Sequence, residues 1–524
     1  MIAILAEKPS VAREIAQIVG SRTKKDGYLE GNNYAVTWAY GHLIGLDSPE
    51  SYGYKGAWQR SQLPMMPDVF TVSPLSEADR KIEKLHADQL KTISRLFKKA
   101  DSIIVATDAG REGELIFRHI YNYLSVKDNF RTPFKRLWIS SLTDKSIREG
   151  LENLKDGREY DNLYAAGKAR SEADWLIGMN GTRAATINVG DRSVWSVGRV
   201  QTPTLCMVCK RYLENKNFVS EPYWMIRSMF HKGGISFTGT NPMKFMQKEA
   251  ADGLFNRLKD VPSMRVSRVE KKPSYSNPPL LFDLTSIQKE ANVKFGLSAD
   301  TTLKICQSLY EKKLTTYPRT GSRYIPDDVY QLLPQLVNNA CVYTRFADYA
   351  RTLVGKPLGR ISVNAAKVTD HHALLPTENR PAADSMNDLE RKIYELILGR
   401  MLESVSPREE KFVTTATLVA NSVKDFPFTV KGSIVVKPGW RAVFNEKQKA
   451  AEDENERLPD FTVGEEITVE KIILDTKHTK APPLLTENSL LALMETAGKE
   501  LENEEEREAM KNIGIGTPAT VPKS

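Results

Sequence analysis

The sequence predicts a multidomain fold in which an α/β domain is followed by helical and β-rich segments. Three observations lead to this prediction. The chain has 524 residues, more than one hydrophobic core usually serves. Residues 1–150 alternate short apolar runs with stretches of helical spacing, which is typical of a parallel sheet covered by helices. After residue 150 the pattern changes several times between helical and β, which indicates segments that leave and re-enter the same domain.

Within the α/β region, three apolar runs are the predicted strands: "IAIL" at 2–5, "YAVTWAY" at 34–40 and "SIIVAT" at 102–107. Helical spacing at 87–100 and 113–124 predicts helices on either side of the third strand. Glu7 follows the first strand and Asp108 follows the third. Ligands of parallel sheets bind beyond the carboxyl ends of the strands, so we expect both carboxylates at one ligand-binding edge.

The rest of the chain divides by pattern into five segments. Residues 151–215 are helical and rich in small residues, 216–278 are β, 279–410 are mainly helical, 411–484 are β, and 485–524 are helical. We expect 151–215 with 485–524 to form one domain, 216–278 with 411–484 a second, and 279–410 a third.

Composition narrows the class of protein. The formal charge of +8 and the pI of about 9.0 are compatible with a polyanionic partner but do not establish one. No stretch reaches 18 uncharged apolar residues and the N-terminus lacks the features of a signal peptide, so we expect a cytoplasmic protein without a membrane span. Cys206 and Cys209 form a lone CxxC without the second pair that a four-cysteine zinc site needs, which favours core cysteines on a helix.

Acidic residues gather at the predicted strand ends. Asp108, Glu112 and Glu114 lie at a strand-to-helix junction, with Glu7 expected beside them. Clustered carboxylates repel each other unless a cation is present, and an all-oxygen set favours Mg²⁺ or Mn²⁺. The alternative is an acidic first helical turn that suits the helix dipole. That alternative explains Glu112 and Glu114 but not Glu7.

A second group of residues surrounds a tyrosine in "KKLTTYPRTGSRYIP" (312–326). Tyr317 has Arg319, Lys312, Lys313 and Arg323 as sequence neighbours. A free phenol has a pKa of about 10, so ionising it at pH 7 costs roughly 4 kcal/mol. Nearby cations lower that cost, and the composition suits attack of a tyrosyl oxygen on a phosphodiester. The alternative, a packed tyrosine with a hydrogen-bonded hydroxyl, is favoured by these residues taken alone.

A third group lies in "ARSEADWLIGMNGTRAAT" and "SVWSVGRVQTPTL". Arg170 and Asp174 are four residues apart, on one helical face. Arg183, Arg199 and the polar residues near Arg199 supply donors for phosphates, which fix position without reading sequence. An ordinary surface ion pair explains Arg170 and Asp174 equally well.

Nine collinear motifs show a family resemblance that runs from Met1 to about Thr520. They are "LAEKPSVA", "GHLIGL", "ATDAGREGELI", "ARSEADWLIGMNGTRA", "SVGRVQTPTL", "PPLLFDLTSIQ", "TYPRTGSRY", "DHHALLPT" and "GIGTPAT". Together they resemble the type IA DNA topoisomerases. The resemblance implies a TOPRIM domain at 1–150 that carries the metal site, and four domains in a toroid around a hole wide enough for DNA. Residues 151–215 with 485–524 would be a helical DNA-binding domain, 216–278 with 411–484 a β-rich arch, and 279–410 the helical domain of the nucleophile.

The family's reaction is implied with the fold. The tyrosine at position 317 would attack one strand of single-stranded DNA, keep the 5′ phosphate and release a 3′ hydroxyl. Another DNA segment would pass through the gap before the hydroxyl reseals it, which relaxes negative supercoils and decatenates. No ATP is expected, because the phosphotyrosyl bond conserves the energy of the broken bond and the sequence has no GxxxxGK[ST] loop.

The resemblance also implies roles for individual residues. Glu7 would exchange a proton with the 3′ oxygen, Lys8 would stabilise developing charge, Arg319 would position the phosphate and His371 would lie near the nucleophile. Mg²⁺, which Mn²⁺ can replace, would bind Glu7, Asp108 and Glu112. Trp58 is either a base-stacking residue or a core tryptophan. The implied DNA-binding residues are Trp58, Arg170, Asp174, Arg183, Ser196, Val197, Gly198, Arg199, Val200 and Gln201.

The chain departs from the family pattern in three places. Gly110 replaces a metal-site aspartate, which predicts a weakened or rearranged site with Glu114 as a stand-in ligand. Gly321 replaces a frequent aspartate after the tyrosine motif. The chain stops soon after "GIGTPAT", which predicts an incomplete last helical domain.

We expect a monomer that acts on DNA with a helicase or single-strand-binding protein as a possible helper. The competing hypotheses are a TOPRIM-type nuclease or primase-like enzyme, and a degenerate DNA-binding remnant without catalysis.

Overall fold

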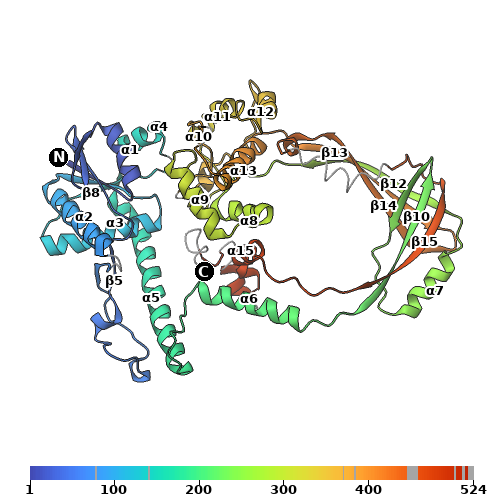
Figure 1. Cartoon of the computed structure of the whole chain (residues 1–524), viewed down its shortest axis with the longest axis horizontal. Coiled ribbons are helices and arrows are strands. Elements are labelled where there is room, and N and C mark those ends of the chain that lie inside the picture. The colour runs from blue at the N-terminus through green and yellow to red at the C-terminus, as the bar shows by residue number, and fades with distance from the viewer. Residues whose placement is uncertain are drawn as a thin grey trace.

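The computed structural model describes residues 1–76, 80–139, 142–369, 371–382, 385–444, 458–500, 503–509 and 514–516. The predicted combination of an α/β domain with helical and β-rich segments is confirmed. Figure 1 shows a ring-like arrangement, with the α/β domain at one end, a β-barrel at the other and helical segments between them. Among the described helices, none is long and apolar enough to cross a membrane.

The N-terminal domain is built on a seven-stranded sheet of order β2-β3-β4-β1-β7-β8-β9. Four strands in the middle run parallel: β4 (Tyr34–Trp38), β1 (Ile2–Ala6), β7 (Ser102–Ala106) and β8 (Phe134–Arg136). The antiparallel edges are β2 (Thr23–Lys25), β3 (Tyr28–Gly31) and β9 (Lys155–Asp156). The sheet therefore continues beyond residue 150.

Helices cover both faces of this sheet. Residues of β1 alternate between the faces, as the two-residue period of a strand requires. Leu5 packs with the apolar stripes of α2 (Arg80–Lys99) and α3 (Arg111–Asp128). Ile4 packs with α1 (Pro9–Val19) and α4 (Asp144–Glu152) on the other face. The three layers leave only the strand ends open for a site.

A long excursion of the N-terminal domain lies against the next helix. It connects β5 (Ile44–Leu46) to β6 (Val72–Pro74), which pair with each other. Trp175 in α5 (Asp161–Val189) donates to the carbonyl of Asp47 at 2.8 Å. Asn180, one turn further on, bonds both backbone groups of Met65, at 2.6 and 3.0 Å. The excursion is thereby fixed to α5, which is followed by α6 (Gln201–Lys216).

A closed six-stranded barrel of order β10-β11-β14-β13-β12-β15 forms the far end of the molecule. Its strands are β10 (Pro222–Lys232), β11 (Ile235–Thr240), β12 (Ser263–Ser276), β13 (Glu409–Ala420), β14 (Val423–Lys437) and β15 (Glu466–His478). Helix α7 (Lys248–Leu258) packs against it. Because β12 and β13 are paired neighbours, the chain between them is an insertion that leaves and re-enters the barrel.

That insertion is a helical unit with its own apolar core. Its helices are α8 (Leu284–Phe295), α9 (Ala299–Glu311), α10 (Asp327–Tyr330), α11 (Leu333–Ala340), α12 (Ala347–Leu353) and α13 (Asp388–Ser404). Near the C-terminus, α15 (Glu487–Glu495) packs against both α6 and α8, and α16 spans Glu504–Ala509. Of the motif "GIGTPAT" (514–520), only 514–516 are among the described residues, and the predicted domain boundaries stay predictions.

The prediction for the CxxC pair was wrong. Cys206 and Cys209 are exposed on α6, whereas Cys306 is buried in the helical unit. Leu205, which directly precedes Cys206, is also 61% exposed. The described residues therefore do not cover this part of the α6 surface.

The turn between β7 and α3 leaves no room for a side chain at Gly113. A Cβ there would lie 2.1 Å from the carbonyl oxygen of Asp108. We therefore expect Gly113→Ala to lower the melting temperature, because the backbone of Asp108 must shift. Gly253→Ala is the matched control: Gly253 lies in α7 with open space around it, and alanine should stabilise there by roughly 0.5–1 kcal/mol. Equal melting temperatures of the two variants would contradict the steric argument.

Candidate active site

Two carboxylates meet where neighbouring parallel strands end. Ala6 of β1 pairs with Ala106 of β7, so Glu7 and Asp108 emerge from the sheet at the same edge. The backbone N–H of Asp108 donates to Glu7 Oε2 at 3.2 Å. Glu7 is 9% exposed, and burial together with the charge of Asp108 raises the pKa of its carboxyl group. The contact between Glu7 and Asp108 is therefore the one that the strand-end rule predicts.

A lysine and a histidine face Asp108. Lys8 Nζ lies 3.1 Å from Asp108 Oδ2 and 3.4 Å from Glu7 Oε1, and His371 Nε2 lies 3.0 Å from Asp108 Oδ2. Burial alone would raise the pKa of Asp108, but the bonds from His371 and Lys8 outweigh it and hold this pKa well below its usual range. Burial likewise acts to lower the pKa of Lys8, and the charges of Asp108 and Glu7 raise it instead.

Tyr317 lies against the same lysine. Lys8 Nζ is 3.9 Å from the centroid of the Tyr317 ring, and the His371 ring centroid is 4.7 Å from it. The tyrosine is in a coil segment between α9 and α10 that is bonded to the chain around His371. Thr316 N donates to Leu375 O at 2.9 Å, and Thr320 Oγ1 donates to His371 O at 2.7 Å. These hydrogen bonds hold the segment of Tyr317, the candidate nucleophile, next to the segment of His371.

The cations next to Tyr317 in the sequence are not the ones at its ring. Lys312 Nζ bonds the carboxylate of Glu390 at 2.7 Å, and Arg323 Nε donates to the carbonyl of Leu281 at 3.1 Å. The prediction that the motif's own lysines and arginines surround the phenol was wrong in this respect. Burial raises the pKa of Tyr317, and Lys8 is the cation that opposes the rise.

Arg319 keeps its guanidinium available. It is half-buried, and within the described part of the chain no hydrogen bond or ion pair engages it. A planar fork without a protein partner near the tyrosine suits bidentate binding of a phosphate.

The predicted set of three metal-binding carboxylates is not assembled. Within the described residues, no group of three or more Asp, Glu, His and Cys side chains is placed to hold a metal ion. Glu112 instead lies 2.6 Å from His42 Nε2, and that hydrogen bond lowers the pKa of its carboxyl group. Glu7 and Asp108 alone fit Mg²⁺, which often binds one or two carboxylates and completes its shell with water and phosphate.

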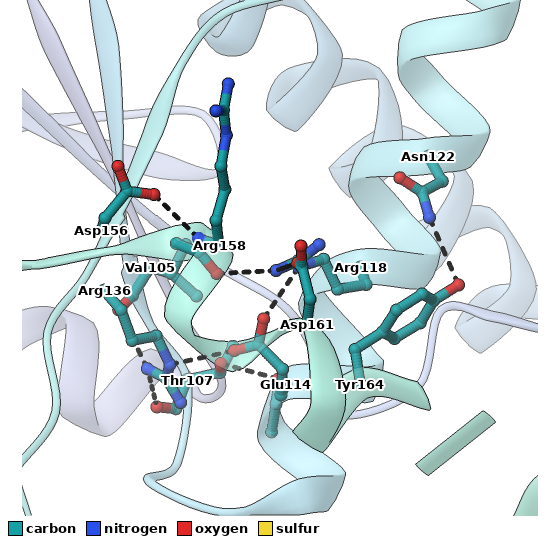
Figure 2. Close-up of polar contacts among 12 residues, drawn as sticks. Val105, Thr107, Glu114, Arg118, Asn122, Arg136, Asp156, Arg158, Asp161 and Tyr164 are labelled. Carbon is teal, nitrogen blue, oxygen red and sulfur yellow. Dashed lines mark hydrogen bonds and ion pairs between the residues drawn. The ribbon is translucent and has the colours of Figure 1, made fainter. Parts of the chain in front are cut away.

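Glu114 is not a stand-in ligand, so that prediction was wrong. Its side chain is 1% exposed and forms ion pairs with Arg118 and Arg136 in the interior (Figure 2). Gly110 is the N-cap of α3 in an extended conformation, with φ −161°, so its backbone would accept a side chain.

The predicted DNA-binding residues lie along α5, α6 and the excursion. Asp174 pairs with Arg199 rather than with Arg170. Burial and the charges of Arg111 and Arg199 lower the pKa of Arg170, which marks a cluster of three guanidiniums. Such a cluster attracts phosphates.

Two further predicted residues form a stack. Arg183 is 4% exposed and bonds Glu50 at 2.9 Å, with its guanidinium 5.2 Å from the ring centroid of Trp58. Arg183 therefore packs against Trp58, and its guanidinium is not exposed for binding a phosphate. This corrects the prediction that Arg183 is a phosphate donor. Trp58 is 37% exposed, so it is not a core tryptophan.

The remaining predicted residues shape the turn before α6. Ser196 Oγ accepts from Gln201 Nε2 at 2.6 Å, Val197 N donates to Thr182 Oγ1 at 3.0 Å, and Gly198 N donates to Thr202 Oγ1 at 3.1 Å. Val200 is the N-cap of α6. The turn is thus tied to α5 and to the first turn of α6.

Comparison with known proteins decides the family. Residues 158–524 match the family described as "DNA topoisomerase", and residues 2–142 match the "Toprim domain". Proteins named "DNA topoisomerase 3" are similar over 99% of this chain: the one from Bacillus cereus (strain ATCC 14579) is 40% identical and that from Shouchella clausii 39%. The chain belongs to the type IA DNA topoisomerases.

The fold agrees with this membership. The chain spans 70% of the length of those two relatives. The full-length topoisomerase I from Thermotoga maritima superposes with a TM-score of 0.66 over 99% of this chain and 77% of that one, at 23% identity. Type IA topoisomerases and their Toprim domains generally use Mg²⁺.

The sequence prediction overlooked one residue of this topoisomerase's site. His42 follows β4, the strand on the other side of β1, and reaches Glu112. The strand-end argument used for Glu7 and Asp108 applies to the predicted strand at 34–40 as well, and it would have pointed to His42 in "GHLIGL".

Because Gly110 accepts a side chain, its replacement tests the metal site. We expect Gly110→Asp to lower the Mg²⁺ concentration for half-maximal relaxation several-fold, because it returns a carboxylate to the strand edge. Gly110→Asn is the control, since asparagine caps a helix as well as aspartate but adds no charge. Equal Mg²⁺ dependence of the two variants would show that position 110 does not face the cation.

Proposed function

We propose that this topoisomerase cleaves one strand of single-stranded DNA with Tyr317, holds the 5′ phosphate, passes another DNA segment through the gap and reseals it. The outcome is relaxation of negative supercoils and decatenation without ATP. One observation carries the proposal: Lys8 contacts the ring of Tyr317 and the carboxylates of Asp108 and Glu7 at once. Tyr317 and the carboxylates of the strand edge, which are far apart in the sequence, therefore belong to one proposed site.

The chemistry assigns each side chain a task. The phenolic oxygen of Tyr317 loses its proton to water and forms a bond to phosphorus as the bond from phosphorus to the 3′ oxygen breaks. Lys8 and Arg319 stabilise the extra negative charge on the phosphate. Burial and the charge of Asp108 raise the pKa of Glu7, whose carboxyl group would donate a proton to the departing 3′ oxygen. Resealing runs the same steps in reverse, which explains why no ATP is needed.

Strand passage requires that the two halves of the site separate. Besides the Lys8 and His371 contacts, polar bonds join the α/β domain to the helical unit: Ser10 Oγ to Tyr310 Oη at 3.4 Å and Thr143 Oγ1 to Asp328 at 3.3 Å. Water can replace such bonds at little cost, unlike a buried apolar interface. The helical unit is attached to the barrel through β12 and β13, so it can swing away while remaining tethered.

The cofactor and partners follow from the same site. Glu7 and Asp108 would hold Mg²⁺, or Mn²⁺ in its place, and the cation would neutralise phosphate charge when bound. DNA would lie along α5 and the turn before α6, with Trp58 as a stacking surface. We further propose a monomer that acts on chromosomal or plasmid DNA in the bacterial cytoplasm, with a helicase or single-strand-binding protein as helper.

A covalent tyrosyl intermediate separates this proposal from its competitors. We expect Tyr317→Phe to form no adduct with single-stranded DNA while its DNA affinity stays within about twofold, because only the attacking oxygen is lost. The assay is denaturing electrophoresis of 5′-linked adduct, with affinity measured on the same preparation. If the parent protein cuts DNA without forming an adduct, it is a nuclease. If it binds DNA without cutting it, it is a non-catalytic DNA-binding remnant. An adduct formed by Tyr317→Phe would refute the assignment of Tyr317 as the nucleophile.

Phosphate contacts should make binding depend steeply on salt. We expect Arg199→Ala to flatten the plot of log affinity against log salt by up to about one unit, since one phosphate contact is lost. Asp174→Asn, which frees Arg199 from its ion pair, should keep the parent's slope and bind more tightly. An unchanged slope for a folded Arg199→Ala protein would remove Arg199 from the DNA contacts.

A further inference from the structure

A fully buried arginine holds the end of the strand that carries Asp108. Arg136 in β8 is 1% exposed, and its guanidinium donates to the carbonyls of Val105 at 3.0 Å, Thr107 at 2.8 Å and Asp108 at 2.6 Å. Figure 2 shows this guanidinium directed at the end of β7. The carbonyl of Val105 also accepts from Leu137 N at 2.9 Å, and that of Asp108 from Gly110 N at 2.8 Å. The guanidinium therefore adds to the bonds that hold the backbone at Asp108 and joins the last residues of β7 to those that follow it.

The charge of Arg136 is balanced by a carboxylate from the following helix. Arg136 Nε lies 3.1 Å from Glu114 Oε2, and Glu114 Oε1 accepts from Arg118 Nε at 2.8 Å. Both Glu114 and Arg136 are inaccessible to water, so neither charge is tolerable without the other. The acidic motif therefore contributes one carboxylate to this interior network rather than to the strand edge.

The same network reaches the DNA-binding helix. Arg118 Nη2 bonds the carbonyl of Gly157 at 2.8 Å and the carboxylate of Asp161 at 2.7 Å. Asp161 is the first residue of α5, the helix on which Arg170 and Asp174 lie further along. A continuous series of charged contacts thus runs from the backbone of Asp108 to the N-terminus of α5 (Figure 2).

We propose that Arg136 is a positioning residue for Asp108, and that the series Arg136–Glu114–Arg118–Asp161 links the placement of α5 on DNA to the placement of this carboxylate. Arg136 and Glu114 are buried, so they act on the site through other residues. The proposal rests on the function proposed above and deepens it, because it states how DNA held along α5 reaches the catalytic edge. A buried ion pair is weak as a source of stability compared with apolar packing, whereas the five N–H donors of a guanidinium can hold three carbonyls and a carboxylate at once.

The test uses single-turnover cleavage by the full chain, with the rate at saturating DNA, the half-saturating DNA concentration and the melting temperature measured separately. Arg136→Lys keeps a positive charge, but its three N–H donors cannot bond Glu114 and the three carbonyls together. We expect its saturating rate to fall at least tenfold while half-saturation stays within twofold of the parent. Arg158→Lys is the control: Arg158 is exposed, its side chain points away from the network in Figure 2, and it should match the parent.

Asp161→Asn tests the link to α5. Its carboxylate is 58% exposed, so the variant should fold even if Arg136→Lys does not. We expect Asp161→Asn to have a several-fold lower cleavage rate at saturating DNA. The double variant Arg136→Lys with Asp161→Asn should be no slower than Arg136→Lys alone, because both changes break the same network.

Three results would overturn the proposal: a parental rate per folded Arg136→Lys molecule, a parental rate for Asp161→Asn, or fold-changes that multiply in the double variant. A loss of melting temperature alone would assign a purely structural role. Absence of adduct from the parent protein would instead refute the proposed function, so the two failures are distinguishable.

Discussion

The ammonium group of Lys8 is the point on which the site depends. Its Nζ lies 3.1 Å from Asp108 Oδ2, 3.4 Å from Glu7 Oε1 and 3.9 Å from the centroid of the Tyr317 ring. Each of those groups is withdrawn from water, and burial by itself makes an ionised carboxylate or phenolate unfavourable. One cation between them offsets part of that penalty on both sides. The fold can therefore keep a nucleophile and two carboxylates within one small volume.

The architecture explains how residues so far apart in sequence meet at this lysine. Parallel pairing of β1 with β7 brings positions 7–8 beside position 108. The insertion between β12 and β13 brings Tyr317 and His371 from the opposite side, and bonds between their two segments keep them together. The barrel supplies a closed base without exposed strand edges. The joint between the halves is mainly polar, which suits an interface that opens and closes in each cycle.

The sequence predicted those parts of the site that depend on the geometry of neighbouring strands. The contact between Glu7 and Asp108 followed from the strand-end rule, which needs only that two strands be parallel and adjacent. The predicted set of Glu7, Asp108 and Glu112 was not assembled because Glu112 bonds His42 instead. Glu114, the expected stand-in, is two residues further along the helix and faces another way. Glu114 turns into the interior, where Arg136 and Arg118 receive it. The family resemblance indicated the enzyme class but not this division of carboxylates.

Other errors came from contacts between distant segments. Residues that adjoin Tyr317 in a coil do not share its direction, so Lys312 and Arg323 bond elsewhere while Lys8 arrives from another domain. Arg183 has the composition of a phosphate donor, but the 47–71 excursion places Glu50 against it. No periodicity in the sequence reveals where a long excursion packs. Whether each of these predictions was correct depended on a contact with a residue from a distant segment of the chain.

The assignment of Lys8 as the cation of the nucleophile can be measured directly. Single-turnover adduct formation with single-stranded DNA should be compared for the parent, Lys8→Met and Lys313→Met, with DNA affinity as a check on binding. Lys313 adjoins the tyrosine motif in sequence but is exposed. The account predicts that Lys8→Met slows adduct formation by about 100-fold or more, as removal of one preorganised donor does, while Lys313→Met stays within about twofold of the parent. A parental rate for Lys8→Met, or an equal loss in Lys313→Met, would contradict it.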